Sequence, residues 1–309
     1  MTSAAASLTD LAGLPFAKGH GTGNDFVLVA DPESRHDVSA AHVAALCDRH
    51  QGIGGDGFIR AVRTRDLPEA ADLAAAHPEA EWFMDYRNSD GSIAEMCGNG
   101  VRVFVHFLLD QGLTELNDGD VLPVGTRAGL KLVTRSDNGY AVDMGTWRFT
   151  FPGKAAERAL DSLVETGGIE AGRPGLSVDM GNPHTVVALS DAGELERARL
   201  HDIPVVEPLP PHGTNVEYVL PAEPLVQDGV GRIRIRIHER GVGETQSCGT
   251  GACAAVVATR HWSGGVPAER WDVEVPGGVV TVKFLTGTEG EERVELSGPA
   301  VIVAHGVLG

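Results

Sequence analysis

Hydrophobic and polar residues alternate along several stretches of the chain, and this period of two predicts β-strands. The clearest stretch is GRIRIRIHERG, in which Ile and Arg alternate from Arg232 to Ile237. The isoleucines would face a core and the arginines would face solvent. Further strands are predicted where short apolar runs lie between turns, in segments 14–30, 58–62, 82–87, 130–145, 176–190, 214–221, 271–285 and 293–308. Within 130–145, Asn138-Gly139 is the expected hairpin turn.

Longer apolar runs predict two buried helices. One begins near Gly98 and ends at about Asp110, and the other covers GTGACAAVVATRHW. A shorter helix is expected from Ser39 to Asp48, with Ser39 as its N-cap. Segment 63–81 is rich in Ala and acidic residues, and we expect an exposed, partly helical insertion there. Segment 150–175 has scattered Gly, Pro and charge, and we expect a connector.

The two halves of the chain repeat one order of features. The stretch Gly23-Asn24-Asp25 precedes Cys97, and Gly181-Asn182-Pro183-His184 precedes Cys248. Each half contains a strand, a Gly-Asn turn, more strands, a Cys-Gly-x-Gly motif and then an apolar helix. This order predicts a duplicated α/β unit with pseudo-twofold symmetry.

Length, composition and charge narrow the possible classes of protein. With 309 residues and 42% hydrophobic residues, the chain can form one large or two ordinary domains. Its formal net charge is −18, which argues against nucleic acid or an anionic membrane surface as a partner. A small zwitterionic substrate stays possible, because only local charge matters for such a ligand.

The cysteines and the apolar segments indicate a cytoplasmic protein. No segment reaches the ~18 apolar residues of a membrane span, and the first residues lack the basic start of a signal peptide. The four cysteines, Cys47, Cys97, Cys248 and Cys253, form no disulfide framework, which is typical of a reducing compartment. No CxxC pair occurs and the histidines are scattered, so we expect no metal site.

The Cys-Gly-x-Gly motif before a helix has a specific chemistry. The first backbone N–H groups of a helix have no partner inside it and carry roughly half a positive charge. Glycines leave these groups uncovered, so a carboxylate can approach closely. A cysteine there is expected to have a lowered pKa. The motif therefore predicts an anion cradle and a base in one place.

Two such motifs in matching positions suggest inversion of a stereocentre. If the two halves face each other, one cysteine can remove a proton from a carbon and the other can return one to the opposite side. The helix ends would stabilise the carbanion next to the substrate carboxylate, with water excluded. No cofactor is needed for this chemistry, and the two thiols would titrate as a coupled pair.

The motifs together resemble those of one known family. In order along the chain they are GHGTGNDF, RNSDGS, EMCGNGVR, MGNPH, TNVEYV and ERGVGETQSCGTGACA, and they are similar to those of diaminopimelate epimerases over nearly the whole chain. The resemblance implies pyridoxal-independent interconversion of LL- and meso-2,6-diaminopimelate, in lysine and peptidoglycan-precursor biosynthesis. It also implies a cytoplasmic homodimer that binds a small amino-acid substrate.

The resemblance implies a fold and a domain division as well. We expect an α/β (α+β) protein of two pseudo-symmetric domains, each a mostly antiparallel or mixed, barrel-like sheet around a central helix. The first domain would cover 1–148 and regain a strand at about 296–309, and the second would cover 149–295.

The resemblance also implies roles for individual residues. Cys97 and Cys248 match the catalytic pair, and His184 and Glu239 match the groups that tune proton transfer beside them. The cradle of the reacting carboxylate corresponds to Gly98, Asn99, Gly249 and Thr250. Side chains that hold the substrate correspond to Asn24, Asn88, Asn182, Asn215, Glu239 and Arg240. Many family members have glutamine where this chain has Gly57, so one substrate contact is missing or supplied by another residue.

Other interpretations stay open at this stage. Cys47 and Cys253 are expected to be packed core thiols. His184 could cap a turn, and Asn24 could serve only its own turn. A proline racemase or hydroxyproline epimerase of the same fold is an alternative function, and a non-catalytic thiol-redox protein is another. The polar set Asn88, Asn182, Asn215 and Arg240 favours a substrate with a second polar end.

Overall fold

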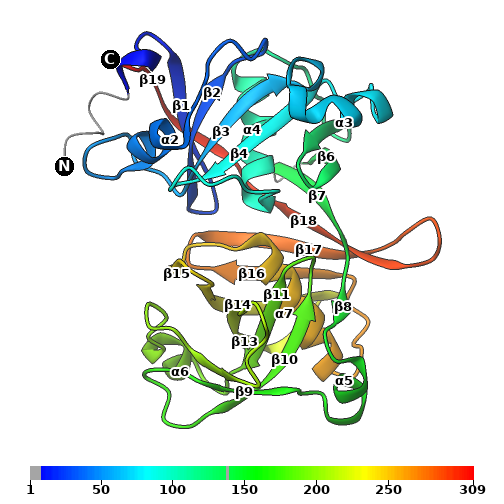
Figure 1. Ribbon diagram of the computed structural model, residues 1–309. Coiled ribbons are helices and arrows are strands. Elements are labelled where there is room, and N and C mark those ends of the chain that lie inside the picture. Colours follow the sequence, from blue (N-terminus) through cyan, green and yellow to red (C-terminus); the bar gives the residue numbers. More distant parts are fainter. Residues whose placement is uncertain (1–7, 137–138) are drawn as a thin grey trace. The chain divides into compact units, whose positions relative to one another are not determined.

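The computed structural model of the protein describes residues 8–136 and 139–309. The chain divides into two compact units. The first unit ends at Val142 and regains Gly298–Gly309, and the second unit is Asp143–Ser297. Both units are drawn in Figure 1.

The chain up to residue 146, together with the last strand, consists mostly of strands with a few helices between them. They are β1 (Pro15–Gly21), β2 (Asn24–Ala30), α2 (Ala40–Cys47), β3 (Gly57–Arg63), α3 (Ala71–Ala76), β4 (Trp82–Asn88), α4 (Gly98–Asp110), β5 (Val121–Thr126), β6 (Gly129–Ser136), β7 (Gly139–Thr146) and β19 (Val301–Val307). Short 3-10 turns cover Thr9–Leu11, Thr64–Asp66 and Pro68–Ala70.

The remaining elements follow in the same style. They are β8 (Arg148–Phe149), α5 (Pro152–Arg158), β9 (Ser162–Glu165), β10 (Arg173–Asp179), β11 (Pro183–Ala188), α6 (Ala192–Arg197), β12 (Val205–Glu207), β13 (Asn215–Gln227), β14 (Val230–Glu239), β15 (Gly243–Thr245), α7 (Gly249–Trp262), β16 (Arg270–Val275), β17 (Gly278–Thr286) and β18 (Glu292–Gly298).

Strand pairing repeats between the units. In the first, β1–β2 is antiparallel, β2–β3 parallel, β3–β4 antiparallel, β4–β5 parallel and β5–β6 antiparallel. In the second, the pairs β10–β11, β11–β13, β13–β14, β14–β16 and β16–β17 follow the same sequence of directions. The last strand, β19, pairs antiparallel with β1.

Each unit surrounds one apolar helix with strands. Helix α4 contacts β1, β2, β3, β4, β6 and β19, and α7 contacts β10, β11, β13, β14, β16 and β17. Both helices are buried along most of their length. Surrounding an apolar helix with strands removes its side chains from water, and this burial is the main driving force for packing helix and sheet together. The predicted fold class is confirmed.

Several local predictions are confirmed. Ser39 caps α2, because its Oγ accepts the His42 N–H at 3.2 Å. The isoleucines of β14 are buried as expected, but the intervening arginines are half-buried and not fully in solvent. Cys47 and Cys253 are buried core thiols, and burial raises the pKa of Cys47 to about 12.

Two predictions are wrong. Segment 150–175 is no connector, since α5 lies in it and β9 pairs with both β10 and β12. Segment 63–81 is partly helical, as expected, but it is not simply exposed. Leu67 and Ala70 pack with Val62 and Phe83 in a small apolar cluster.

The Asn138 half of the expected hairpin turn lies outside the described residues. Among the helices that are described, none is long and apolar enough to cross a membrane.

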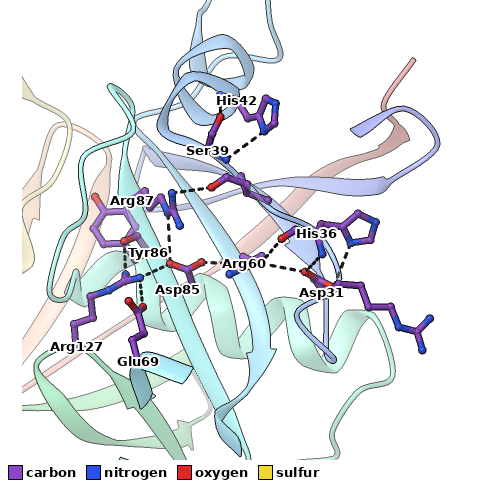
Figure 2. Close-up of polar contacts among 12 residues, drawn as sticks. Asp31, His36, Ser39, His42, Arg60, Glu69, Asp85, Tyr86, Arg87 and Arg127 are labelled. Atoms are coloured by element: carbon purple, nitrogen blue, oxygen red, sulfur yellow. Dashed lines mark hydrogen bonds and ion pairs between the residues drawn. The ribbon is translucent and has the colours of Figure 1, made fainter. Parts of the chain in front are cut away.

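A buried network of charges fixes β4, the strand that ends at Asn88. The Asp85 carboxylate is fully buried and accepts from Arg60 Nε at 2.9 Å and from Arg127 Nη2 at 2.6 Å. Arg60 also donates to Asp31, and Figure 2 shows the chain of contacts. Burial alone would raise the pKa of Asp85, but the Arg127 and Arg60 guanidinium groups outweigh burial and lower it. Arg127 also donates to the Tyr86 carbonyl at 3.0 Å, so the network holds the strand backbone.

We predict that Asp85→Asn lowers the free energy of unfolding by about 3 kcal/mol, because it removes the buried negative charge that the Arg60 and Arg127 guanidinium groups share and leaves them only Asp31 and Glu69 as carboxylate partners. Denaturant titration of the full chain measures the change. Asp118→Asn is the matched control, since Asp118 is 66% exposed in its pair with Arg135 and exposed pairs contribute only about 0–1 kcal/mol. Equal effects of the two substitutions would contradict the role of the network.

Candidate functional site

Cys97 lies at the point where the backbone enters α4. It is the N-cap residue, with extended backbone (φ −138°, ψ 121°), and its Sγ accepts the Gly100 N–H at 3.4 Å. The side chain is half-buried. The N–H groups of Gly98 and Asn99 belong to the first turn, whose donors are not used by the hydrogen bonds of the helix itself and can bind an anion.

Asn24 reaches this helix from the β1–β2 turn. Gly23 makes the turn with φ +82°, a conformation that favours glycine. Asn24 Oδ1 lies 3.5 Å from Cys97 Sγ and accepts from Asn99 Nδ2 at 3.3 Å. The fully buried Arg102 donates to Asn99 Oδ1 at 2.6 Å. One polar chain thus orients both the amides and the thiol.

The second unit repeats this arrangement at Cys248. Cys248 is the N-cap of α7 with φ −121° and ψ 117°, and its Sγ lies 3.5 Å from Thr250 Oγ1. Asn182, which follows Gly181 at φ +92°, donates from Nδ2 to Thr250 Oγ1 at 3.3 Å. In both units, therefore, an asparagine from a Gly-Asn turn bonds the second residue of the helix that the cysteine caps.

His184 forms a fully buried polar pair with Glu217 and also contacts Asn182. Its Nε2 is 3.0 Å from Asn182 Oδ1, and its Nδ1 is 2.6 Å from Glu217 Oε1. The side chains of His184 and Glu217 are both 0% exposed. Sequence reasoning missed Glu217, and its only signal was an acidic residue inside the buried strand TNVEYVLP.

The remaining predicted residues of the second unit gather where β13, β14 and β15 meet. Asn215 Oδ1 accepts the Arg240 backbone N–H at 3.0 Å, and its Nδ2 donates to the Pro183 carbonyl at 3.3 Å. Glu239 accepts from Thr245 Oγ1 at 2.5 Å. Asn215 therefore ties Arg240, the residue directly after β14, to the start of β11.

Asn88 is held at the end of β4 by two neighbours. Tyr86 donates its hydroxyl to Asn88 Oδ1 at 3.2 Å, and Asn88 Nδ2 donates to Ser92 Oγ at 3.0 Å. Tyr86 also meets Phe26 edge to face. The Asn88 amide is therefore positioned by the Tyr86 hydroxyl on one side and by Ser92 on the other.

The same ring explains Gly57. Gly57 lies opposite Asn88 in the β3–β4 register, and a Cβ at Gly57 would lie 2.7 Å from Tyr86 Cε2 and 2.8 Å from the Arg87 carbonyl oxygen. The Tyr86 ring therefore occupies the space that a side chain at position 57 would need. A side chain at position 57 would begin 3.4 Å from the Tyr86 hydroxyl. A phenolic hydroxyl group therefore lies beside the position at which this chain lacks a polar side chain.

One electrostatic prediction is wrong. The helix N-terminus was expected to lower the pKa of the cysteines, but burial raises the pKa of Cys248 well above its ordinary value, and the Glu239 carboxylate raises it further. The hydrogen bonds from Thr250 and Gly251 lower it only in part. Cys248 is therefore a neutral thiol at neutral pH.

The chain is similar to known proteins over nearly its full length. The family model described as diaminopimelate epimerase matches residues 16–150 and 176–303. A relative of that name from Streptomyces coelicolor (strain ATCC BAA-471 / A3(2) / M145) is 47% identical over 302 residues, which cover 95% of this chain and 94% of that protein.

Solved structures with much lower identity share the fold. A Bacillus anthracis phenazine biosynthesis protein of the PhzF family gives a TM-score of 0.63 at 15% identity, covering 95% of this chain and 98% of that one. A probable proline racemase from Agrobacterium radiobacter K84 gives a TM-score of 0.59 at 16% identity, covering 96% and 93%.

We predict that Gly57→Ala destabilises the protein by about 1–3 kcal/mol, because the new methyl group would overlap the Tyr86 ring and a backbone oxygen. Denaturant unfolding of Gly57→Ala, Tyr86→Leu and the double variant measures the coupling. If the ring is the obstacle, the double variant loses less than the sum of the single losses, by at least about 0.5 kcal/mol. Additive losses would contradict the overlap.

We also predict slow alkylation of Cys248 at neutral pH, because only the thiolate reacts. In the reduced Cys97→Ala variant, the rate with iodoacetamide should still rise as the pH passes about 9, as followed by peptide mass spectrometry. Adding Glu239→Gln removes a negative charge, lowers the pKa of Cys248 and should speed the reaction at fixed pH. A rate that levels off below pH 8 would contradict the raised pKa.

Proposed function

Because the chain belongs to the diaminopimelate epimerase family, we propose that it interconverts LL- and meso-2,6-diaminopimelate by two-base chemistry without pyridoxal phosphate. The observation that carries this proposal is the duplicated half-site, in which Cys97 and Cys248 each cap the first turn of a buried helix. The reaction would serve lysine and peptidoglycan-precursor biosynthesis.

In this proposal the two thiols exchange the α-proton. One thiolate removes the proton from the α-carbon, and the other thiol donates a proton to the opposite side. Each cysteine then holds the protonation state with which the other began, so the reverse reaction uses the same two groups. The raised pKa of Cys248 supports Cys248 as the proton donor of the resting enzyme.

The helix ends supply the electrostatic stabilisation. An α-proton beside a carboxylate is far less acidic than a thiol, so the carbanion needs hydrogen-bond donors that are already in place. The backbone N–H groups of Gly98 and Asn99, and of Gly249 and Thr250, are the donors in this proposal. They are oriented before substrate arrives, because Asn24 bonds Asn99 and Asn182 bonds Thr250.

The polar side chains away from the helix ends would hold the second amino-carboxylate end. We assign this role to Asn88, Asn215 and Arg240, and we assign His184 and Glu239 to the control of proton transfer. The cytoplasmic location and the homodimeric state expected from the sequence are part of the same proposal.

The main rival is a proline racemase or hydroxyproline epimerase. A proline-type substrate has no second charged end and makes no use of the amides of Asn88 and Asn215 or the guanidinium of Arg240, which bond to other groups of the chain in its absence. A substrate with a second amino-carboxylate end gains hydrogen bonds from these groups that proline cannot make. The polar set therefore favours diaminopimelate.

Deuterium exchange from D₂O into the substrate tests the proposal. We predict that the reduced wild type exchanges the α-proton of diaminopimelate but not that of L-proline, as followed by NMR. Cys97→Ala and Cys248→Ala should each lower the epimerisation rate by at least about 100-fold, the usual scale for losing a positioned acid or base.

Cys253→Ala is the matched control, because this cysteine is buried five positions beyond Cys248 in the same helix, and it should keep its activity. An absence of exchange in the fully reduced wild type would remove the proposal. Near-normal activity in Cys248→Ala would remove the two-base scheme while leaving an epimerase.

A further inference from the structure

The matching registers of the two units show which residues occupy equivalent positions. In the parallel pair β2–β3, Phe26 lies opposite Gly57. In the equivalent parallel pair β11–β13, His184 lies opposite Asn215. Phe26 and His184 are therefore equivalent, each two residues after the asparagine of its Gly-Asn turn. One unit has an apolar ring where the other has an imidazole.

The same registers make Ile59 and Glu217 equivalent. Two residues further along the strands, Leu28 lies opposite Ile59 and Val186 lies opposite Glu217. An apolar pair in the first unit is thus replaced by a fully buried acid–imidazole pair in the second. The duplicated scaffold is chemically unequal at this point.

In each unit, a glycine in the first turn of the central helix faces the pair at this position, which is Phe26 and Ile59 in the first unit and His184 and Glu217 in the second. A Cβ at Gly100 would lie 3.4 Å from Ile59 Cδ1 and 3.5 Å from Phe26 Cζ, which is ordinary contact. A Cβ at Gly251 would lie 2.7 Å from Glu217 Oε1, which is an overlap. The space for the carboxyl group therefore depends on Gly251.

The hydrogen bonds set the number of protons on the pair. Asn182 uses Nδ2 to donate to Thr250, so its Oδ1 must accept from His184 Nε2, which carries a hydrogen. The 2.6 Å contact between His184 Nδ1 and Glu217 Oε1 then contains one proton. Whichever of the two atoms holds that proton, the pair has no net charge.

We propose that Glu217 is a positioning residue for the epimerisation: it shares one proton with His184 Nδ1 and so keeps the Nε2–H of the imidazole directed at Asn182. Only the predicted effect on the rate of epimerisation depends on the proposed function. The tautomer of His184 follows from the geometry of the second unit alone.

The surroundings favour the form in which both groups are neutral. Burial raises the pKa of Glu217, and His184 lowers it only in part. Glu217 Oε2 has no hydrogen-bond partner among the described residues, which costs less for a neutral acid than for a carboxylate. Two titratable groups lie close to Cys248, namely Glu239 on β14 and Glu217 on β13. Because the pair of Glu217 and His184 is neutral, it adds no negative charge beside the thiol to that of Glu239.

A glutamine at position 217 separates a positioning role from a packing role. The amide of Glu217→Gln fills the same space, but it cannot share a proton with Nδ1, because its N–H can only donate and its carbonyl oxygen can only accept. We predict that kcat falls at least about tenfold, as expected for a lost proton-holding partner, with KM within about twofold and an unchanged melting temperature. Glu194→Gln is the matched control, since Glu194 is a buried acid of the same unit that pairs with Arg173, and its kcat should not change.

NMR of ¹⁵N-labelled histidine gives a readout that needs no turnover. The His184 signals are assigned by their loss in His184→Gln. We expect a protonated Nε2 from about pH 6 to about pH 9, the range in which an ordinary histidine loses its charge, and a changed Nδ1 shift in Glu217→Gln.

An unprotonated Nε2 in the wild type, or wild-type kcat in Glu217→Gln, would overturn the inference. If wild type showed the expected tautomer but exchanged no α-proton, the proposed function would fail while the assignment of His184 and Glu217 stood.

Discussion

The first turn of a buried helix, capped by a cysteine, is the constraint on which the rest of the structure depends. In the proposed reaction its N–H groups bind an anion, which accounts for the glycines that follow each cysteine and for the asparagine that holds the second helical residue from the side. The helix can be buried only because six strands surround it. The barrel-like sheets, the Gly-Asn turns and the charge network behind β4 all maintain that geometry.

Duplication explains the shape of the site but not its chemistry. Cys, Gly and Asn recur at matching positions in the two units, so each unit places one thiol at the first turn of a buried helix. The residues behind the cradle differ, with Phe26 and Ile59 in one unit and His184 and Glu217 in the other. Two-base inversion needs one ionised and one neutral thiol, and unequal surroundings are a physical means of separating two otherwise equivalent groups.

Much of the fold could be predicted from local pattern. The apolar run after Cys97 marks α4 at both ends, and the Ile–Arg alternation marks the buried face of β14. The prediction for segment 150–175 was wrong, because β9 is stabilised by pairing with β10 and with the more distant β12 and not by its own composition. The half-site residues could be predicted, but Glu217 bonds His184 across 33 positions, and Tyr86 fills the space above Gly57 only once two strands pair. The raised pKa of Cys248 follows mainly from burial, with a smaller contribution from the Glu239 carboxylate, and burial by other parts of the fold cannot be read from the motif around the cysteine.

The most direct test of the central claim is a crystal structure of the reduced protein with an unreactive diaminopimelate analogue bound. The account predicts that the sulfurs of Cys97 and Cys248 lie on opposite sides of one α-carbon, each at about 3–4 Å, the distance of a reacting pair. The analogue carboxylate should accept hydrogen bonds from the first turns of both α4 and α7. A bound analogue with either sulfur far from the α-carbon would contradict two-base inversion.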